Sequence, residues 1–314
     1  TNTEDTKRIL NEVRKEVEVE CLRRYMGELS INLTEGLELS AEDFDQQRAK
    51  VVFDNNSYQL MKAKSKKLQY ALNVHGHLID HHYDRIQGSE NVCSICNIRP
   101  TSNAINQHNR TIQLCDQCYE TAQLGQNIPK TRFLSFERKG NKQGKHMFHI
   151  PVAGSLVLSK THGMYAINET VPGSARWDLP FFLPHSSEDE EDILTFEDLA
   201  ELSPGIPKIA MLKADVDNLG ALFSIGLQES LSFSRYATFS RMMNAFFSYY
   251  INHKISTDFR ELYTVFSGGD DLCIIGPWKP VLDFALQMQM DFDRFVGHNP
   301  DVSISAGIVL ESPH

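Results

Sequence analysis

The 314-residue sequence lacks three features that would each place it in a particular class of protein. No apolar run is long enough to cross a bilayer, so no membrane-spanning helix and no membrane partner is expected. No secretory signal is visible, which favours a reducing, cytoplasmic compartment. Basic residues are not in excess either: the formal net charge of -10 argues against a broad nucleic-acid surface, so RNA contacts must come from local patches or partner subunits.

The length and the hydrophobic fraction of 41% allow more than one buried core, and we expect two or three domains. Basic side chains gather in two short stretches, each of which could equally be an ordinary solvated surface. The first contains Lys62, Lys64, Lys66 and Lys67, and the second contains Arg132, Arg138, Lys139, Lys142 and Lys145.

The most informative stretch is 266–272, where two adjacent carboxylates, Asp270 and Asp271, follow Gly268 and Gly269. β-branched and aromatic residues flank the stretch on both sides, which predicts a β-hairpin with the glycines in its turn. Glycine accepts the positive φ of a tight turn and leaves room for a triphosphate to approach the backbone. Paired acids at such a turn can bind hard divalent cations such as Mg²⁺ or Mn²⁺.

A second acidic site follows the mostly apolar run 207–215, which predicts a central strand covered on both faces and ends in Asp215. If this strand lies beside the hairpin, Asp215 converges with Asp270 and Asp271. Two metal ions ~4 Å apart could then bind the attacking and leaving oxygens of a phosphoryl transfer. The alternative is a hairpin turn with solvated acids that bind nothing.

The order of elements around these acids predicts an α+β fold. Ser232 or Ser234 can begin a helix, the hairpin follows, a second helix comes after Pro280, and a strand covers 302–308. The order βαββαβ is that of a ferredoxin-like palm domain, with the acids at adjacent strand ends. The side chains expected to face the core from the two helices are Tyr236, Phe239, Met243, Phe246, Phe247, Tyr250, Val281, Ala285, Met288, Phe292 and Phe295.

Four of the six cysteines form two Cys-x-x-Cys pairs separated by eighteen residues, the spacing of a structural four-thiolate zinc site. We favour zinc over a disulfide pair because the other two cysteines, Cys21 and Cys273, lie in apolar, core-like contexts. The four candidate ligands are Cys93, Cys96, Cys115 and Cys118.

Histidines also gather near this module, but four thiolates already saturate one zinc ion. We therefore interpret these histidines, and His108 in the zinc loop, as surface or packing residues rather than ligands. The cluster contains His75, His77, His81 and His82, with Asp80 and Asp84.

The positions of these motifs and expected elements divide the chain into four predicted parts. Residues 1–72 form part of a first palm domain, 73–130 an inserted zinc-binding module, 131–204 a strand-rich connector with an acidic linker, and 205–314 a second palm domain with the Gly-Gly-Asp-Asp turn. Within the first part we expect a helix, a second helix after Ala41 and, between them, a strand with alternating Leu29, Ile31 and Leu33.

The motifs together resemble the large subunit of type III-A (Csm-type) CRISPR effector complexes over nearly the whole chain. The resemblance rests on the four-cysteine module, Leu124-Gly125 to Pro129-Lys130, and the following second-palm motifs: Ala214-Asp215-Val216-Asp217-Asn218-Leu219-Gly220, Ser234-Arg235, Phe246-Phe247, Ser267-Gly268-Gly269-Asp270-Asp271 and Ser305-Ala306-Gly307. It implies a synthase that converts ATP into cyclic oligoadenylates when a complex containing guide RNA and other subunits captures target RNA.

The resemblance also implies roles for individual residues. Asp215, Asp270 and Asp271 would be catalytic ligands of Mg²⁺ or Mn²⁺, with one metal lowering the pKa of a ribose 3'-hydroxyl and the other bridging the triphosphate. Backbone amides around Asn218 would cradle phosphate oxygens. The residues expected to bind ATP are Asp217, Asn218, Leu219, Gly220, Ser267, Gly268 and Gly269.

The sequence departs from the family pattern in three places. The HD-type nuclease domain that cuts single-stranded DNA lies outside this chain, the first palm lacks its opening strand and hairpin, and the helical domain after the second palm is missing. We therefore expect a fragment, which makes activity of the isolated chain doubtful. Two other functions stay open: a diguanylate-cyclase-like enzyme, whose turn would continue with Glu-Phe in place of Asp271-Leu272, and a non-catalytic scaffold that positions RNA.

Overall fold

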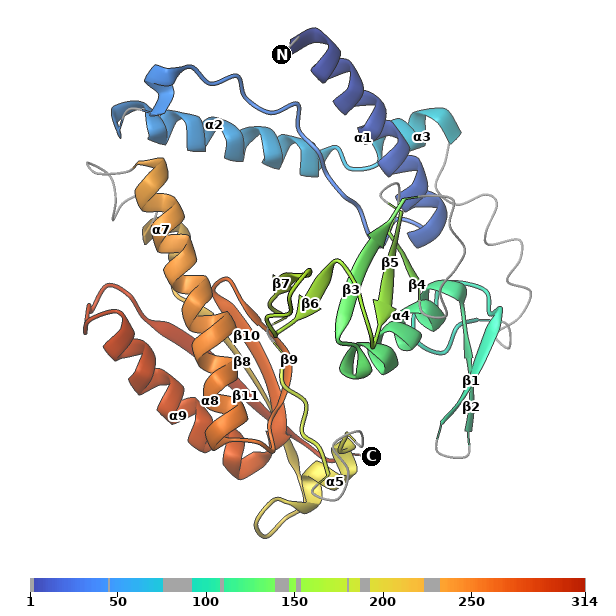
Figure 1. The fold of residues 1–314 in the computed structure, drawn as a ribbon, viewed down its shortest axis with the longest axis vertical. Coiled ribbons are helices and arrows are strands. Elements are labelled where there is room, and N and C mark those ends of the chain that lie inside the picture. Colours follow the sequence, from blue (N-terminus) through green and yellow to red (C-terminus); the bar gives the residue numbers. More distant parts are fainter. Residues whose placement is uncertain are drawn as a thin grey trace. The chain divides into compact units, whose positions relative to one another are not determined.

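The computed structural model describes residues 3–44, 46–75, 92–107, 110–138, 147–150, 154–179, 181–186, 193–222 and 232–313 (Figure 1). The chain divides into two compact units, one with Thr1–Glu38 and Asp54–Trp177 and the other with Leu39–Phe53 and Asp178–His314. Several residues singled out in the sequence lie outside the described ranges: His77, Asp80, His81, His82, Asp84, His108, Lys139, Lys142, Lys145 and most of the acidic linker.

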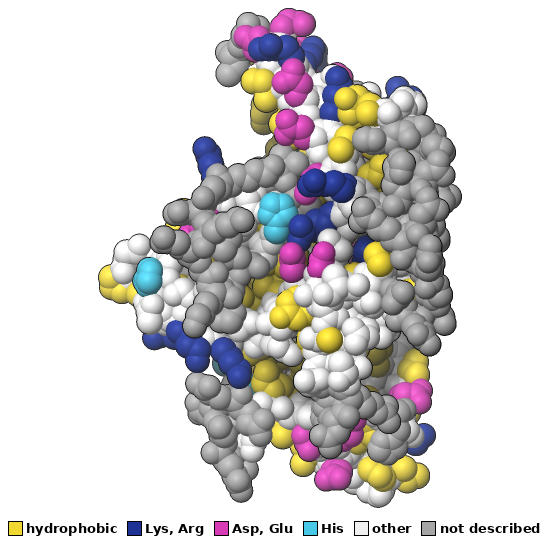
Figure 2. All heavy atoms as spheres, turned by 90° about the vertical axis from the view of Figure 1, so that its right-hand side faces the viewer, with side chains coloured by type: hydrophobic (Ala, Val, Ile, Leu, Met, Phe, Trp, Pro, Cys, Tyr) yellow, Lys and Arg dark blue, Asp and Glu magenta, His cyan; other side chains and the backbone are white. Residues whose placement is uncertain are grey.

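The first unit begins with a helix whose end charges complement the helix dipole. In α1 (Thr3–Tyr25), Glu4 and Asp5 occupy the first turn and Arg23 and Arg24 the last. Figure 2 shows acidic and basic side chains interspersed along this helix rather than gathered by sign. The other helical elements with residues in this unit are α2 (Gln46–Ser65), α3 (Gln69–His75), α4 (Asp116–Asn127) and the short η4 (Ile128–Lys130).

The strand predicted around Leu29, Ile31 and Leu33 is absent, because residues 28–40 adopt neither helix nor strand. Alternating apolar residues form a strand only where a neighbouring strand can pair with their backbone. Among the described residues this segment has no pairing strand, and Leu29 and Ile31 are 46% and 39% exposed. The prediction of a strand from this periodicity was therefore wrong.

Two sheets belong to the first unit. The strands β1 (Asn103–Gln107) and β2 (Arg110–Leu114) form an antiparallel hairpin beside the cysteines. A five-stranded sheet with the order β4-β5-β3-β6-β7 is antiparallel except for its last pair. Its strands are β3 (Phe133–Glu137), β4 (Met147–Ile150), β5 (Gly154–Ser159), β6 (Tyr165–Ile167) and β7 (Ala175–Trp177).

The second unit contains a four-stranded antiparallel sheet with the order β11-β8-β10-β9. Chain order and spatial order together are those of a ferredoxin-like βαββαβ domain. The α+β class and the palm arrangement of the second unit are therefore confirmed. The strands are β8 (Ile209–Val216), β9 (Tyr263–Gly268), β10 (Asp271–Pro277) and β11 (Ile304–Glu311).

Helices cover one face of this sheet (Figure 1). Ser232 caps the N-terminus of α7 (Phe233–Asn244), as predicted, because its hydroxyl accepts a hydrogen bond from the Arg235 N–H at 3.2 Å. The helical elements are η1 (Ala41–Phe44), α5 (Phe196–Glu201), α6 (Leu219–Ala221), α7 (Phe233–Asn244), the π-helical η6 (Ala245–Tyr250), α8 (Ile251–Asp258) and α9 (Trp278–Phe295).

The core of the second unit lies between the helices and the sheet. Phe246, Phe247, Met288 and Phe292 are buried there, as their helical spacing predicted. The strand β8 is central but not covered on both faces: Ala210, Leu212, Ala214 and Val216 are buried, whereas Met211, Lys213 and Asp215 are exposed. The expectation of two covered faces was wrong because all the neighbouring strands are antiparallel and this sheet has its main helix layer on one side. This leaves Asp215 on the open face.

None of the helices in the described ranges is both long enough and apolar enough to cross a bilayer.

Candidate active site and candidate metal centre

The acidic residues at the strand ends are brought together by the register of the sheet. Asp215 on β8 lies directly opposite Asp271 on β10. On its other side Asp215 faces Ser305 on β11. Residues directly opposite one another in an antiparallel pair project from the same face, with Cβ atoms about 4.5–5.5 Å apart. The open face of the sheet therefore carries two carboxylates at one end.

The third carboxylate, Asp270, belongs to the two-residue turn between β9 and β10. Gly269 in this turn has φ +67°, which glycine adopts without the strain that a side chain would bring. The Asp270 carbonyl accepts a hydrogen bond from the Val216 N–H at 3.1 Å, which fixes the turn to the end of β8. The predicted hairpin is thus confirmed, and its turn lies beside Asp215.

Electrostatic repulsion among these acids is evident at Asp270. Partial burial raises the pKa of its carboxyl group, and the negative charges of Asp215 and Asp271 raise it further. Like charges opposite one another destabilise a sheet unless a cation lies between them. The donor set, oxygen only and clustered at one edge, fits Mg²⁺ or Mn²⁺.

The segment after β8 has its own hydrogen bonds. The Asp217 carboxylate accepts a hydrogen bond from the Ser303 hydroxyl at 2.6 Å, and this bond together with one from Ser305 lowers the pKa of Asp217. Asn218 is left-handed, with φ +54°, and precedes the short α6. The Leu219 side chain packs against the core, so this residue can reach a ligand only through its backbone. Gly220 is exposed, with open space where a side chain would lie.

Hydrogen bonds join the Gly-Gly turn and the residue before it to the helix layer. The buried Ser267 hydroxyl donates to the Phe247 carbonyl at 2.6 Å, so this hydroxyl is already engaged. The Gly269 N–H donates to the Asn244 side chain at 3.3 Å, and that oxygen also accepts from the Ser248 hydroxyl at 2.9 Å. Phe247 and Ser248 belong to the π-helical turn, a distortion that is frequent at functional sites.

The four predicted cysteines converge in the first unit. Their sulfur atoms all lie within 4.8 Å of one another, and those of Cys96 and Cys115 are 3.9 Å apart. Four sulfurs at about 2.3 Å from a tetrahedral zinc are about 3.8 Å from one another, so this set fits zinc. Within the described ranges no other group of potential ligands converges in this way, the three aspartates included.

The cysteine environment favours partial ionisation. Burial opposes the Cys93 thiolate, but hydrogen bonds from the backbone of Cys96, Cys115 and Ile95 lower its pKa to about 6. Burial raises the pKa of Cys118, and the neighbouring sulfurs of Cys115 and Cys93 raise it further. Several thiolates cannot coexist at this distance without a cation, whereas zinc would stabilise all four.

Arg99 connects the cysteines to the end of α1. Its side chain is buried, and the guanidinium donates to the Cys115 sulfur at 3.7 Å and to the Tyr25 carbonyl at 3.3 Å. The same group forms an ion pair with Glu28. No motif or periodicity in the sequence pointed to Arg99, Asn244 or Ser303. Each of these contacts joins residues far apart in the chain, so no local pattern indicates it.

The second unit matches a known family model. Residues 208–314 match the model described as Cas10/Cmr2, second palm domain. The chain is 40% identical over 141 residues to a "CRISPR system single-strand-specific deoxyribonuclease Cas10/Csm1 (subtype III-A)" of Methanocaldococcus jannaschii, an alignment that covers 40% of this chain and 18% of the relative. It is 24% identical over 339 residues to the protein of the same description from Thermococcus onnurineus, covering 98% of this chain and 42% of the relative.

Solved structures share the fold. The crystal structure of a Csm1-Csm4 cassette in complex with cA3 superposes with a TM-score of 0.70 at 20% identity, covering 100% of this chain and 41% of the other. The chain thus spans less than half the length of these relatives. The resemblance seen in the sequence is confirmed: the chain is similar to Cas10/Csm1 proteins of subtype III-A, and residues 208–314 match the second palm domain of the Cas10/Cmr2 model.

Proposed function

We propose that this chain is the nucleotidyl-transfer part of a type III CRISPR RNA-guided antiviral complex, and that it makes cyclic oligoadenylates from ATP when target RNA binds. The observation that carries the proposal is the placement of Asp215 opposite Asp271, with Asp270 in the adjoining turn. A related fold has been crystallised with cA3, a cyclic oligoadenylate. The similarity to Cas10/Csm1 proteins and the acidic sheet edge therefore both support this reaction.

Asp215, Asp270 and Asp271 would hold the divalent cations. Bound Mg²⁺ or Mn²⁺ would neutralise the triphosphate and lower the pKa of the attacking ribose 3'-hydroxyl. The residues themselves supply a fixed geometry: the ladder between β8 and β10 sets the distance between two carboxylates, and the Val216–Asp270 hydrogen bond sets the third. Ionised oxygens held in place cost little reorganisation when a substrate arrives. No separate protein base is required.

The nucleotide would lie along the backbone beside these acids. The segment 218–220 would direct N–H groups at phosphate oxygens, with the left-handed Asn218 turning the chain at that point. The Asp217 N–H already donates to the Ser303 carbonyl at 2.9 Å. Gly268 and Gly269 would let a triphosphate approach closely. Ser267 would contribute through its backbone, because its hydroxyl binds the Phe247 carbonyl.

We assign the four cysteines a structural role. Cys93, Cys96, Cys115 and Cys118 would bind one zinc ion with no open coordination position. Other subunits of the complex, such as the Csm4 that accompanies Csm1 in the related structure, would be the protein partners, together with guide RNA and target RNA. The deoxyribonuclease activity in the relatives' description would belong to a domain other than these 314 residues.

The test is direct detection of product. The full-length subunit, reconstituted with its complex, would be incubated with ATP, magnesium and target RNA, and the products identified by mass spectrometry. Cyclic oligoadenylates that depend on target RNA are expected. A complex that captures target RNA without consuming ATP would instead favour the scaffold, and a cyclic dinucleotide made from GTP would favour a diguanylate-cyclase-like enzyme.

A further inference from the structure

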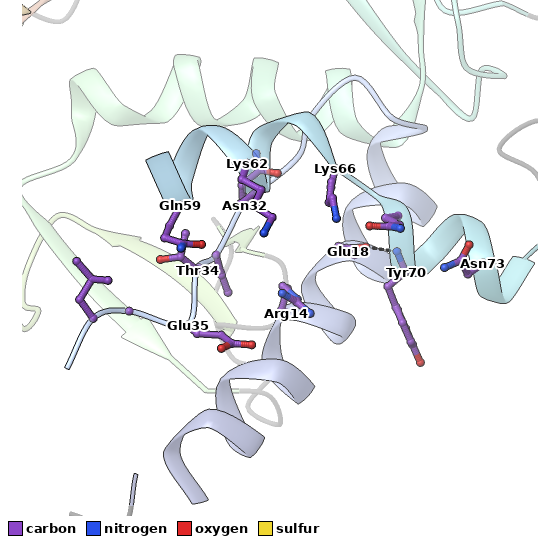
Figure 3. Close-up of a pocket in the computed structure, with 15 residues that line it drawn as sticks. Arg14, Glu18, Asn32, Thr34, Glu35, Gln59, Lys62, Lys66, Tyr70 and Asn73 are labelled. Carbon is purple, nitrogen blue, oxygen red and sulfur yellow. Dashed lines mark hydrogen bonds between the residues drawn. The ribbon is translucent and has the colours of Figure 1, made fainter. Parts of the chain in front are cut away.

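A polar cavity of about 570 Å³ lies within the first unit and contains none of the acidic residues discussed above (Figure 3). Its walls come from α1, the segment 32–37, the end of α2 and α3. Figure 3 shows Arg14 of α1, Asn32 and Lys66 around the same opening. The volume is in the range of cavities that bind small ligands.

The charges around this cavity do not balance. Arg14, Lys62 and Lys66 line it, and neither lysine forms an ion pair with any other described residue. Of the two carboxylates in the wall, Glu18 is engaged because it accepts the Tyr70 N–H at 2.8 Å and the Ala71 N–H at 3.4 Å. Glu35 is the remaining acid. The wall therefore carries three cations and two carboxylates, a formal excess of one positive charge, and this excess favours an anionic ligand.

The uncharged part of the wall combines hydrogen-bonding side chains with the apolar Leu33, Leu37 and Ala63. The side chains of Asn32, Thr34, Gln59, Gln69 and Asn73 all line the cavity. Amides and hydroxyls alongside Lys and Arg are the usual contacts to phosphate and sugar oxygens. A ligand that is apolar apart from one charged group, such as a fatty acid, would leave these groups without partners.

We propose that this cavity binds the phosphate groups of a nucleotide or of a single-stranded nucleic acid, through Arg14, Lys62 and Lys66. The site is local, which is compatible with a chain whose net charge is -10. The inference stands independently of the proposed synthase activity, because it depends only on the first unit. A free nucleotide and a strand of RNA offer the same phosphate chemistry, and the measurement below separates them.

The chain offers a matched control on the same stretch of helix and turn. Lys64 and Lys67 carry the same charge as Lys62 and Lys66 but do not line the cavity. The comparison is therefore between Lys62→Ala with Lys66→Ala and Lys64→Ala with Lys67→Ala, two variants of equal net charge. All four lysines are exposed, so both variants should keep the melting temperature of the parent.

Two probes would be titrated with the protein in buffer without divalent cations: a short fluorescein-labelled single-stranded RNA, followed by fluorescence anisotropy, and a fluorescent ATP analogue. The cavity variant should weaken binding about tenfold, and the control variant less than about twofold. For RNA the slope of log K against log salt should fall by about 1.4 in the cavity variant, since each contact with a single strand contributes about 0.7. Glu35→Gln should tighten binding about twofold by removing the free acid.

Each outcome decides something. A loss seen with both probes or with RNA alone supports the site and includes a nucleic-acid strand among its ligands, whereas a loss with the ATP analogue alone assigns a free nucleotide. Equal weakening by the two lysine pairs would show that binding follows diffuse charge, and the proposal would be wrong. It would be equally overturned if neither probe bound the parent protein.

Discussion

The cysteine cluster and the acidic strand ends are both candidate metal sites, but they differ in almost every physical respect. The four sulfurs are compact, and Cys93 and Cys115 are buried. The carboxylates of Asp215, Asp270 and Asp271 are partly or fully exposed and lie at an open sheet edge. A closed set of four ligands leaves no coordination position for a substrate, whereas an open set of oxygens leaves at least one. The comparison separates a site that supports the fold from one that can take part in a reaction.

The largest effect is expected at the closed site. Purified protein should contain about one zinc per chain, and Cys93→Ser should abolish zinc binding and unfold the module, since binding and folding are coupled. The unfolding should appear as lost hydrogen-exchange protection in β1, β2 and α4. Cys273→Ser, which changes a cysteine outside the cluster, is the control and should keep its zinc. Protein purified without chelators that contained no zinc would contradict the assignment.

The same site should respond to pH in a defined direction. Zinc requires thiolates, and burial raises the pKa of Cys96 and Cys118, so protons compete with the metal as the pH falls. Zinc affinity should therefore decrease steadily from pH 8 towards pH 5, as measured by transfer of the metal to a chromogenic chelator. An affinity that did not change over this interval would exclude thiolate ligands.

A smaller effect is expected where the Gly-Gly turn is held by the helix layer. Ser267→Ala removes the buried hydroxyl that donates to the Phe247 carbonyl, and should lower the free energy of unfolding by about 1 kcal/mol. Ser248→Ala is the matched control, because the hydroxyl it removes lies at the exposed Asn244 contact, and it should cost clearly less. Urea denaturation measures both. Equal losses would show that the buried hydrogen bond is not what holds the turn.

The smallest effect is expected at the open site without metal. Asp270→Asn should raise the free energy of unfolding at pH 7 by about 0.5 kcal/mol, because it removes a charge that repels Asp215 and Asp271. The folded pKa of Asp270 is raised, so its ionisation costs stability. Below the ordinary aspartate pKa, the parent and the variant should have similar free energies of unfolding. As the pH rises through the raised pKa of Asp270, the free energy of unfolding of the parent should drop below that of the variant.

Magnesium provides the control for this last effect. It should stabilise the parent more than the variant and so reduce or reverse the difference at pH 7. A difference that persisted unchanged at all pH values and with magnesium would point to packing rather than repulsion.

The sequence predicted what depends on local pattern. The hairpin with its glycine turn, the helix beginning at Ser232 and the order βαββαβ follow from short-range periodicity and capping, and all are present. The convergence of Asp215 with Asp271 followed from placing two acidic strand ends in one sheet.

The features that the sequence did not predict depend on contacts between residues far apart in the chain. Leu29 and Ile31 alternate like a strand but have nothing to pair with among the described residues. The bonds from Ser303 to Asp217 and from Gly269 to Asn244 join residues 86 and 25 positions apart. The charge balance of the cavity containing Lys62 and Lys66 likewise emerges only once α1 and α2 are placed together.

The most direct measurement of the central claim is product synthesis by the double variant Asp270→Ala, Asp271→Ala in the reconstituted complex with target RNA, ATP and magnesium. Two of the three carboxylates that would hold the divalent cations are gone, so the charge neutralisation that these cations would supply should be lost and oligoadenylates should disappear. Folding, assembly of the complex and capture of target RNA should survive, because the turn is short and partly exposed. Asp301→Ala, an exposed aspartate in the same unit, should keep the parental rate. Oligoadenylates made by the double variant at the parental rate would contradict the account.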